Sequence, residues 1–218
     1  MSQSIDNMGT LNAGWGICGF TSSLYALYTH NPLRQAKLSS GGNQPRRMLG
    51  ELKTYLKVLE SLGEYTLLND IEVFTRSFGG VHSDFTVTKY VQRINDTADT
   101  HFSFSMFGFS IINTTFEKGE ADTKNPLFGI GLPPHVVVDY LKRVCGFANA
   151  HEADLAYTAN EMILGVYDKK GTMQMYGGLA HYLYYLNNRI YSWGQTFNDV
   201  ADAMRGKNWD VCCKIALS

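Results

Sequence analysis

The sequence lacks an uninterrupted apolar run of the length that spans a bilayer, so we expect no transmembrane helix. Its first residues, MSQSIDNMGT, show no basic region followed by an apolar stretch, so no Sec-type signal peptide is expected. We therefore expect the chain to be cytoplasmic in the cell that makes it, or to leave that cell through a specialised secretion system that needs no cleaved signal.

An excess of charge of either sign is also missing. The chain has 19 Lys and Arg against 20 Asp and Glu, which gives a formal net charge of -1. This balance argues against strong attraction to nucleic acid or to an anionic membrane. We expect no nucleic-acid partner and no cofactor.

Cysteine is scarce, with four residues in 218. This is too few for a disulfide scaffold, and the spacing of Cys18, Cys145, Cys212 and Cys213 contains no CxxC metal motif. The neighbouring pair Cys212 and Cys213 cannot readily form an unstrained bridge. We expect mostly reduced thiols and no metal site, because a zinc site needs three or four clustered ligands.

Hydrophobic residues are abundant. They make up 44% of the sequence, which is enough to form the core of one packed domain over residues 1–218. Helical spacing of apolar residues marks the first part, to about residue 160, and alternating strand patterns mark residues 161–218. The sequence therefore predicts an α+β fold. Helices are expected at 19–28, 48–62, 84–94, after 133, at 151–162 and at 197–205. Strands are expected at 162–167, 172–176, 180–186, 189–193 and 211–216, with another within 102–112, and 66–78 fits either a helix or a strand.

Chemistry is indicated at Cys18, which follows the glycine-rich segment Gly-Trp-Gly-Ile and begins a predicted helix. Glycines allow a sharp turn and close approach of a substrate. The positive end of the helix dipole favours a thiolate. The N–H of Cys18 has no partner within the helix, so it is free to donate to a developing oxyanion.

This segment resembles the active-site region of papain-like cysteine peptidases, in which a Gln precedes the nucleophilic Cys by six residues. Asn12 stands at that distance from Cys18. The resemblance implies a papain-like fold, with Cys18 as nucleophile and Asn12 as an oxyanion-hole donor.

A second match begins at His181, which starts a predicted strand and is followed by Tyr191-Ser-Trp-Gly194. Papain-like enzymes place their catalytic His at a strand start and often have Asn-Ser-Trp-Gly on the returning strand. Here Tyr stands in place of that Asn. The resemblance makes His181 the base that takes the Cys18 proton.

The third member of the triad is left open by the missing Asn. If Asn187-Asn188 is a two-residue turn, residue 186 faces 189 and residue 181 faces 194. Gln195 is then the first choice to orient His181, followed by Asp199 and then Asn198.

The resemblance implies hydrolysis of an amide bond in a protein or peptide. The interval between Cys18 and His181 fits papain-like and YopT-type effector proteases better than the shorter NlpC-type and CHAP-type amidases. It points to a bacterial effector toxin, with an immunity protein or a secretion machine as partner. Two alternatives stay open: a peptidoglycan amidase or protein deamidase with the same site, and an inactive binding protein that keeps the fold.

Overall fold

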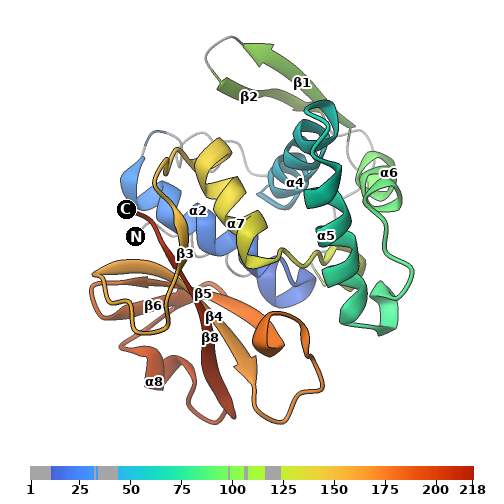
Figure 1. The fold of residues 1–218 in the computed structure, drawn as a ribbon. Helices are drawn as coiled ribbons and strands as arrows, with labels where there is room; N and C mark the ends of the chain where they lie inside the picture. The colour runs from blue at the N-terminus through green and yellow to red at the C-terminus, as the bar shows by residue number, and fades with distance from the viewer. Residues whose placement is uncertain (1–10, 32, 34–43, 98, 106–107, 116–123) are drawn as a thin grey trace.

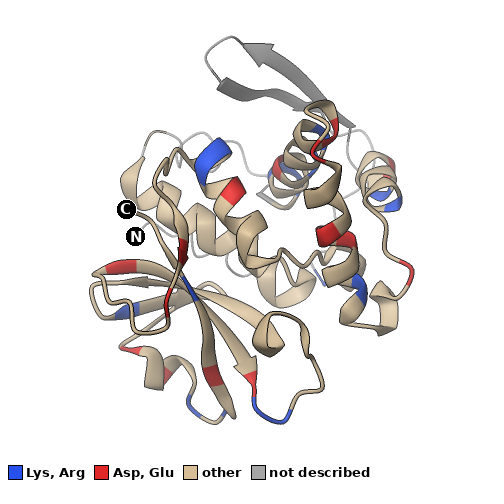
Figure 2. Ribbon diagram, viewed as in Figure 1, with Lys and Arg blue, Asp and Glu red and all other residues tan. Residues whose placement is uncertain are grey.

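The computed structural model describes residues 11–31, 33, 44–97, 99–105, 108–115 and 124–218. Its helices lie in the N-terminal part of the chain and its main sheet in the C-terminal part (Figure 1). The α+β class predicted from the sequence is confirmed. Basic and acidic residues are distributed over both parts, as the even charge balance leads one to expect (Figure 2).

Helix α2 (Cys18–His30) is the central element of the fold. Every residue from Gly19 to Tyr28 is buried, so the helix is enclosed rather than amphipathic. It packs against strands β5 (Leu179–Leu186) and β6 (Arg189–Ser192) and against helix α7 (Pro134–Tyr140). The helix ends at Asn31, since the following Pro32 disfavours helical geometry in the residue before it.

The helices between residues 44 and 145 lie on the same face of the main sheet as α2 (Figure 1). The predictions at 48–62, at 84–94 and after 133 are confirmed with shifted ends, and the ambiguous segment 66–78 is a helix. Their bounds are α4 (Gln44–Ser61), α5 (Tyr65–Ser77), η1 (Gly80–His82), α6 (Val87–Thr97), η2 (Pro126–Phe128), α7 (Pro134–Tyr140) and the π-helical turn η3 (Leu141–Cys145).

The main sheet is antiparallel, with the strand order β3-β8-β4-β5-β6-β7. The last strand in the chain therefore lies between two earlier ones. A separate hairpin of β1 (Asp99–Ser105) and β2 (Gly108–Thr115) stands where one strand was predicted. The bounds in the main sheet are β3 (His151–Ala153), β4 (Glu161–Asp168), β5 (Leu179–Leu186), β6 (Arg189–Ser192), β7 (Gln195–Phe197) and β8 (Trp209–Ala216), with helix α8 (Val200–Ala203) after β7.

Two predicted elements are wrong. Residues 151–162 are not a helix, because β3 pairs with β8 and only a loop separates it from β4. Residues 172–176 are not a strand: the short helical segment η4 (Met175–Gly178) has positive φ at Tyr176, Gly177 and Gly178, and such backbone cannot continue a ladder. The sheet part thus begins near residue 151 rather than 161.

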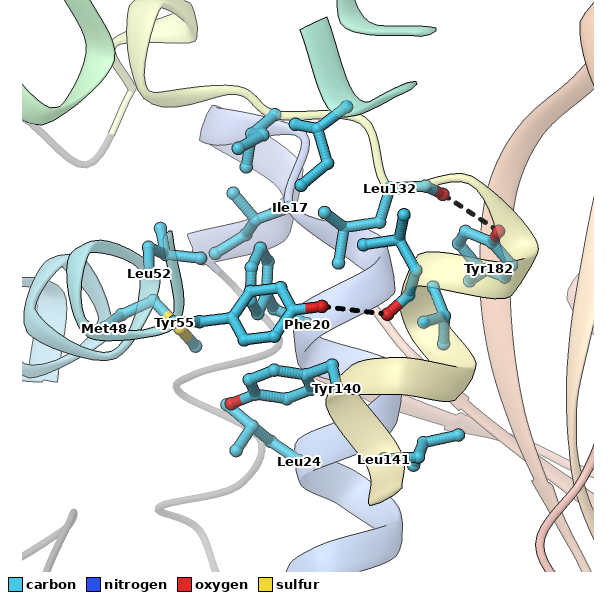
Figure 3. Close-up of a cluster of buried hydrophobic side chains, with 14 of the residues drawn as sticks. Ile17, Phe20, Leu24, Met48, Leu52, Tyr55, Leu132, Tyr140, Leu141 and Tyr182 are labelled. Carbon is cyan, nitrogen blue, oxygen red and sulfur yellow. Dashed lines mark hydrogen bonds between the residues drawn. The ribbon is translucent and has the colours of Figure 1, made fainter. Parts of the chain in front are cut away.

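Both parts of the chain contribute to one hydrophobic cluster, which contains residues from α2, α4 and α7 together with Tyr182 and Tyr184 of β5. Figure 3 shows two of the polar contacts inside it: the Tyr182 hydroxyl donates to the Leu132 carbonyl at 2.9 Å, and the Tyr55 hydroxyl donates to the Val136 carbonyl at 3.3 Å. These bonds satisfy phenol groups that burial would otherwise leave unpaired.

A smaller cluster covers the other face of the sheet, and includes Leu164, Leu183 and Ile190. Aromatic side chains, among them Trp193 and Trp209, pack against it. The sheet is therefore apolar on both faces, which explains why β4 and β5 read as nearly continuous hydrophobic runs.

We predict that Gly165→Ala destabilises the protein by about 1–3 kcal/mol, because overpacking at this position forces its neighbours to move. A Cβ at Gly165 would lie 2.2 Å from the Cys213 sulfur and 2.8 Å from Leu179 Cδ1. Urea unfolding measures the loss. Adding Cys213→Ala should restore part of it, and a neutral Gly165→Ala would contradict the packing described for β4.

Candidate functional site

The turn that leads into Cys18 is held by the side chain of Asn12. Its Oδ1 accepts the Ile17 N–H at 2.8 Å, and its backbone carbonyl accepts the Gly16 N–H at 2.9 Å. Gly16 has a φ of 74°, a conformation that glycine adopts without strain. Asn12 is buried, and only its Nδ2 remains to donate to an oxyanion. The structure thus gives Asn12 a role in shaping the turn that the sequence did not reveal.

The Cys18 thiol lies at the first residue of α2 and is half-buried. The backbone N–H groups of Tyr182 in β5, of Gly19 and of Cys18 itself lie near enough to the sulfur to favour its thiolate form. Burial nevertheless raises the pKa of the Cys18 thiol to about 11, and the N–H donors offset this only in part. At neutral pH the free protein therefore carries a thiol here, not a thiolate.

His181 is buried at 6% exposure and firmly held. Its Nε2 lies 2.7 Å from Ser192 Oγ, and its ring stacks on Trp193 with a centroid distance of 4.2 Å and an interplanar angle of 2°. Burial, assisted by the positive charge of Lys207, lowers the pKa of His181 to about 3. The imidazole is therefore neutral at neutral pH, which is the form that a general base requires.

Cys18 and His181 both lie near the start of β5, but their side chains are not bonded to each other. The thiol lies near the backbone N–H of Tyr182, the residue directly after His181. Successive side chains in a strand point to opposite faces, so Tyr182 joins the cluster around α2 while His181 joins the aromatic group around Trp193. Within the described residues, no hydrogen bond links the thiol to the imidazole.

The residue that binds His181 is Ser192, and the sequence-based ranking of Gln195, Asp199 and Asn198 is not supported. The predicted turn at 187–188 is confirmed by the pair Leu186↔Arg189. Strand β6 ends at Ser192, however, because Trp193 and Gly194 adopt φ values of 51° and 73°. The ladder therefore never reaches the expected pairing of residue 181 with 194.

The three predicted partners are engaged elsewhere. Gln195 pairs with Ser192 across the Trp193-Gly194 turn. The Asp199 carboxylate accepts the Asp202 N–H at 2.7 Å and caps α8, and the Asn198 side chain donates to Asp202 at 3.3 Å. The Ser-Trp-Gly sequence does contain Ser192, but the family motif places the orienting residue at the Asn position before it, where this chain has Tyr191.

A cavity of about 590 Å³ lies at the opposite end of α2. His30, Cys145 and Glu161 are among its lining residues, and His30 Nε2 pairs with Glu161 at 2.7 Å. Twelve residues of helix separate His30 from Cys18, a rise of about 18 Å. The Cys145 thiol donates to the Ser23 carbonyl at 3.8 Å and is buried. This cavity is thus separate from the Cys18 site.

Comparison with family models, with curated proteins and with solved structures finds no match to this chain. Its function is therefore argued from the geometry of the site. Among the described residues, no group of three or more His, Cys, Asp and Glu side chains is arranged to hold a metal ion. In the same part of the chain, no helix has the length and apolar character needed to cross a membrane.

We predict that His181 makes the protein sensitive to mild acid. Its pKa of about 3 lies below the ordinary value of 6.5, so between these pH values the unfolded chain binds a proton that the folded protein does not. Stability from this group is complete above pH 6.5 and falls as the pH drops toward 3, with a slope of up to about 1.4 kcal/mol per pH unit.

The test is the free energy of unfolding as a function of pH for the native protein and for His181→Asn, which does not titrate. The variant should be less stable at pH 7 but should lose less stability on acidification. Parallel curves for the two proteins would show that His181 is not buried in the neutral form.

Proposed function

We propose that the chain is a cysteine hydrolase of amide bonds with a papain-like arrangement, in which Cys18 is the nucleophile and His181 the base. The observation that carries this proposal is the nearness of the Tyr182 backbone N–H, at the start of β5, to the Cys18 thiol, whose pKa it lowers. It puts the sulfur beside the backbone of the residue next to His181, at the start of a helix that packs on the strand.

Proton transfer is the first step of the proposed reaction. Ser192 occupies Nε2 of His181, so Nδ1 is the nitrogen that takes the thiol proton. Stacking on Trp193 and the bond to Ser192 fix the ring on the face of β5 opposite to Cys18, so the proposed transfer requires a rearrangement at the start of β5 that brings the thiol to Nδ1 when substrate binds. The resulting thiolate attacks the carbonyl carbon of the amide.

The tetrahedral oxyanion then needs donors. The backbone N–H groups of Cys18 and Gly19 at the start of α2 lie near the Cys18 sulfur, and the Nδ2 of Asn12 is the side-chain candidate from the same turn. One such donor stabilises the transition state by roughly 3–4 kcal/mol. His181 returns its proton to the leaving amine, and water hydrolyses the thioester to regenerate Cys18.

The substrate proposed first is a peptide bond in a protein. A peptidoglycan amide or a protein side-chain amide requires the same chemistry, so substrate choice depends on the surroundings of the site. Delivery into another cell and an immunity partner stay predictions from the resemblance.

We predict that Cys18→Ser lowers amide hydrolysis by at least about a thousandfold, because the serine hydroxyl is a far weaker nucleophile than a thiolate when its base is a neutral imidazole. The assay offers a protein library and, separately, purified muropeptides. The matched control is Cys145→Ser, which replaces a buried thiol that donates to the Ser23 carbonyl, away from the Cys18 site. It should leave the rate unchanged.

Cleavage that survives Cys18→Ser would refute the proposed nucleophile. Cleavage of muropeptides with proteins untouched would make the enzyme a cell-wall amidase. An intact protein that cleaves nothing in either pool would favour a binding protein that keeps the fold.

We also predict that Ser192→Ala reduces kcat by up to about 100-fold with little change in KM, since the imidazole loses the bond that orients it. Asn198→Ala is the control, because this side chain contacts Asp202 and not His181. Equal rates for the two variants would show that Ser192 does not position the base.

A further inference from the structure

Strand β8 contains a β-bulge at its two neighbouring cysteines. Gly165 of β4 pairs with Cys213, but the next residue, Val166, pairs with Val211. Cys212 is therefore an extra residue without a partner in the ladder. In a regular strand two successive thiols would point to opposite faces. Here both pack against the cluster around α2, so the bulge turns them to the same side.

Gly165 provides the space that the Cys213 sulfur occupies, and Gly177 lies beside Cys212. A Cβ at Gly165 would lie 2.2 Å from the Cys213 sulfur, a distance that no side chain tolerates. A Cβ at Gly177, in the left-handed segment before β5, would lie 3.4 Å from Cys212 Cβ. The pair thus sits in a site shaped by the absence of side chains, and both residues stay partly exposed.

The two thiols are also chemically unequal. The neighbouring Cys213 thiol lowers the pKa of Cys212, while the interaction with Cys212 and burial raise the pKa of Cys213. Cys212 is thus the thiol of the pair that ionises first. An accessible, acidic thiol beside a second thiol is the arrangement found in redox-sensing cysteines.

We propose that Cys212 and Cys213 form an oxidation site for hydroperoxides, in which Cys212 is attacked first and Cys213 resolves the product to a vicinal disulfide. The site is separate from the proposed catalytic function, because neither thiol has a role in that reaction.

The reaction balances in two steps. The Cys212 thiolate attacks one oxygen of the hydroperoxide, the O–O bond breaks, and the other oxygen leaves as an alcohol or water after taking a proton. This gives a sulfenic acid at Cys212. The Cys213 sulfur then displaces its hydroxyl group, which leaves as water with the Cys213 proton, and the S–S bond forms. Two electrons pass from the thiol pair to the peroxide.

The chain geometry makes the oxidised state easy to reverse. Consecutive Cα atoms lie about 3.8 Å apart, below the roughly 4.4 Å at which relaxed disulfides begin. A bridge between neighbours is therefore strained, and strained disulfides are more readily reduced. A small thiol is thus expected to restore the pair.

The experiment treats the whole protein with hydrogen peroxide, blocks free thiols, and identifies the peptide 208–214 by mass spectrometry. The expected product has lost two hydrogens within that peptide and is restored by dithiothreitol. In Cys213→Ser the reaction stops earlier, and dimedone should trap a sulfenic acid at Cys212 at least about tenfold more than at Cys145, which is buried. In Cys212→Ser, Cys213 should react no faster than Cys145.

Several outcomes would overturn the proposal. Sulfinic acid at Cys212 without a disulfide would show that Cys213 does not resolve it. A peroxide-induced bridge from either residue to Cys18 would show that the pair is not the reactive unit. Unmodified thiols under conditions that oxidise free glutathione would show that the site does not react. None of these results depends on amide hydrolysis, so each leaves the proposed function untouched.

Discussion

The burial of helix α2 on all sides is the constraint on which the rest of the structure depends. Because ten successive residues, Gly19 to Tyr28, are enclosed, neither the helices nor the sheet can form its core without this element. Its contacts with β5 and with α7 also fix where its N-terminus lies. The hydrogen bond from Tyr182 to the Leu132 carbonyl ties the same strand to the segment before α7. The position of Cys18 is therefore a consequence of core packing and does not rest on a loop.

The first residues of β5 pack against different groups on the two faces of the sheet. Tyr182 faces the core around α2, and His181 faces the aromatic group on the other side of the sheet, so the backbone N–H near the thiol and the imidazole belong to neighbouring residues of one strand. A bulge between Val166 and Tyr167 of β4 leaves Ala180 unpaired at this point and marks the end of regular pairing. Irregular backbone of this kind re-aims side chains at functional sites. The Cys18 thiol therefore lies near the backbone of the residue that follows His181, without a hydrogen bond to the imidazole.

Much of this organisation could be predicted from local sequence signals. Helical spacing after Gly19 located α2, and the paired asparagines at 187 and 188 located the β5–β6 turn with the correct register. What could not be predicted depends on partners distant in sequence. Residues 151–153 form a strand only because β8 lies beside them, and Ser192 reaches His181 only because Trp193 and Gly194 end β6 early. The bulge at Cys212 has no local signal either, since it appears only when β8 is paired with β4. The roles of Cys18 and His181 stay predictions, because no relative supports them.

The electrostatics of the site argue that any chemistry belongs to the substrate-bound state. With a thiol pKa of about 11 and an imidazole pKa of about 3, transfer of the proton from Cys18 to His181 in the free protein is opposed by on the order of 10 kcal/mol, before the attraction between the two ions is counted. Burial is the largest cause at both residues, and Lys207 adds to it at His181 by disfavouring a second positive charge. In the proposed reaction Cys18 must therefore gain contact with the imidazole. The thiolate must then attack at once, so that its negative charge passes to the carbonyl oxygen of the substrate. There the N–H groups at the start of α2 stabilise it better than they stabilise the buried sulfur. A resting thiol of this kind is protected from oxidation and alkylation, whereas the more acidic Cys212 is not. The same fold thus raises the pKa of the Cys18 thiol and lowers that of Cys212, which is the difference on which the two proposals depend.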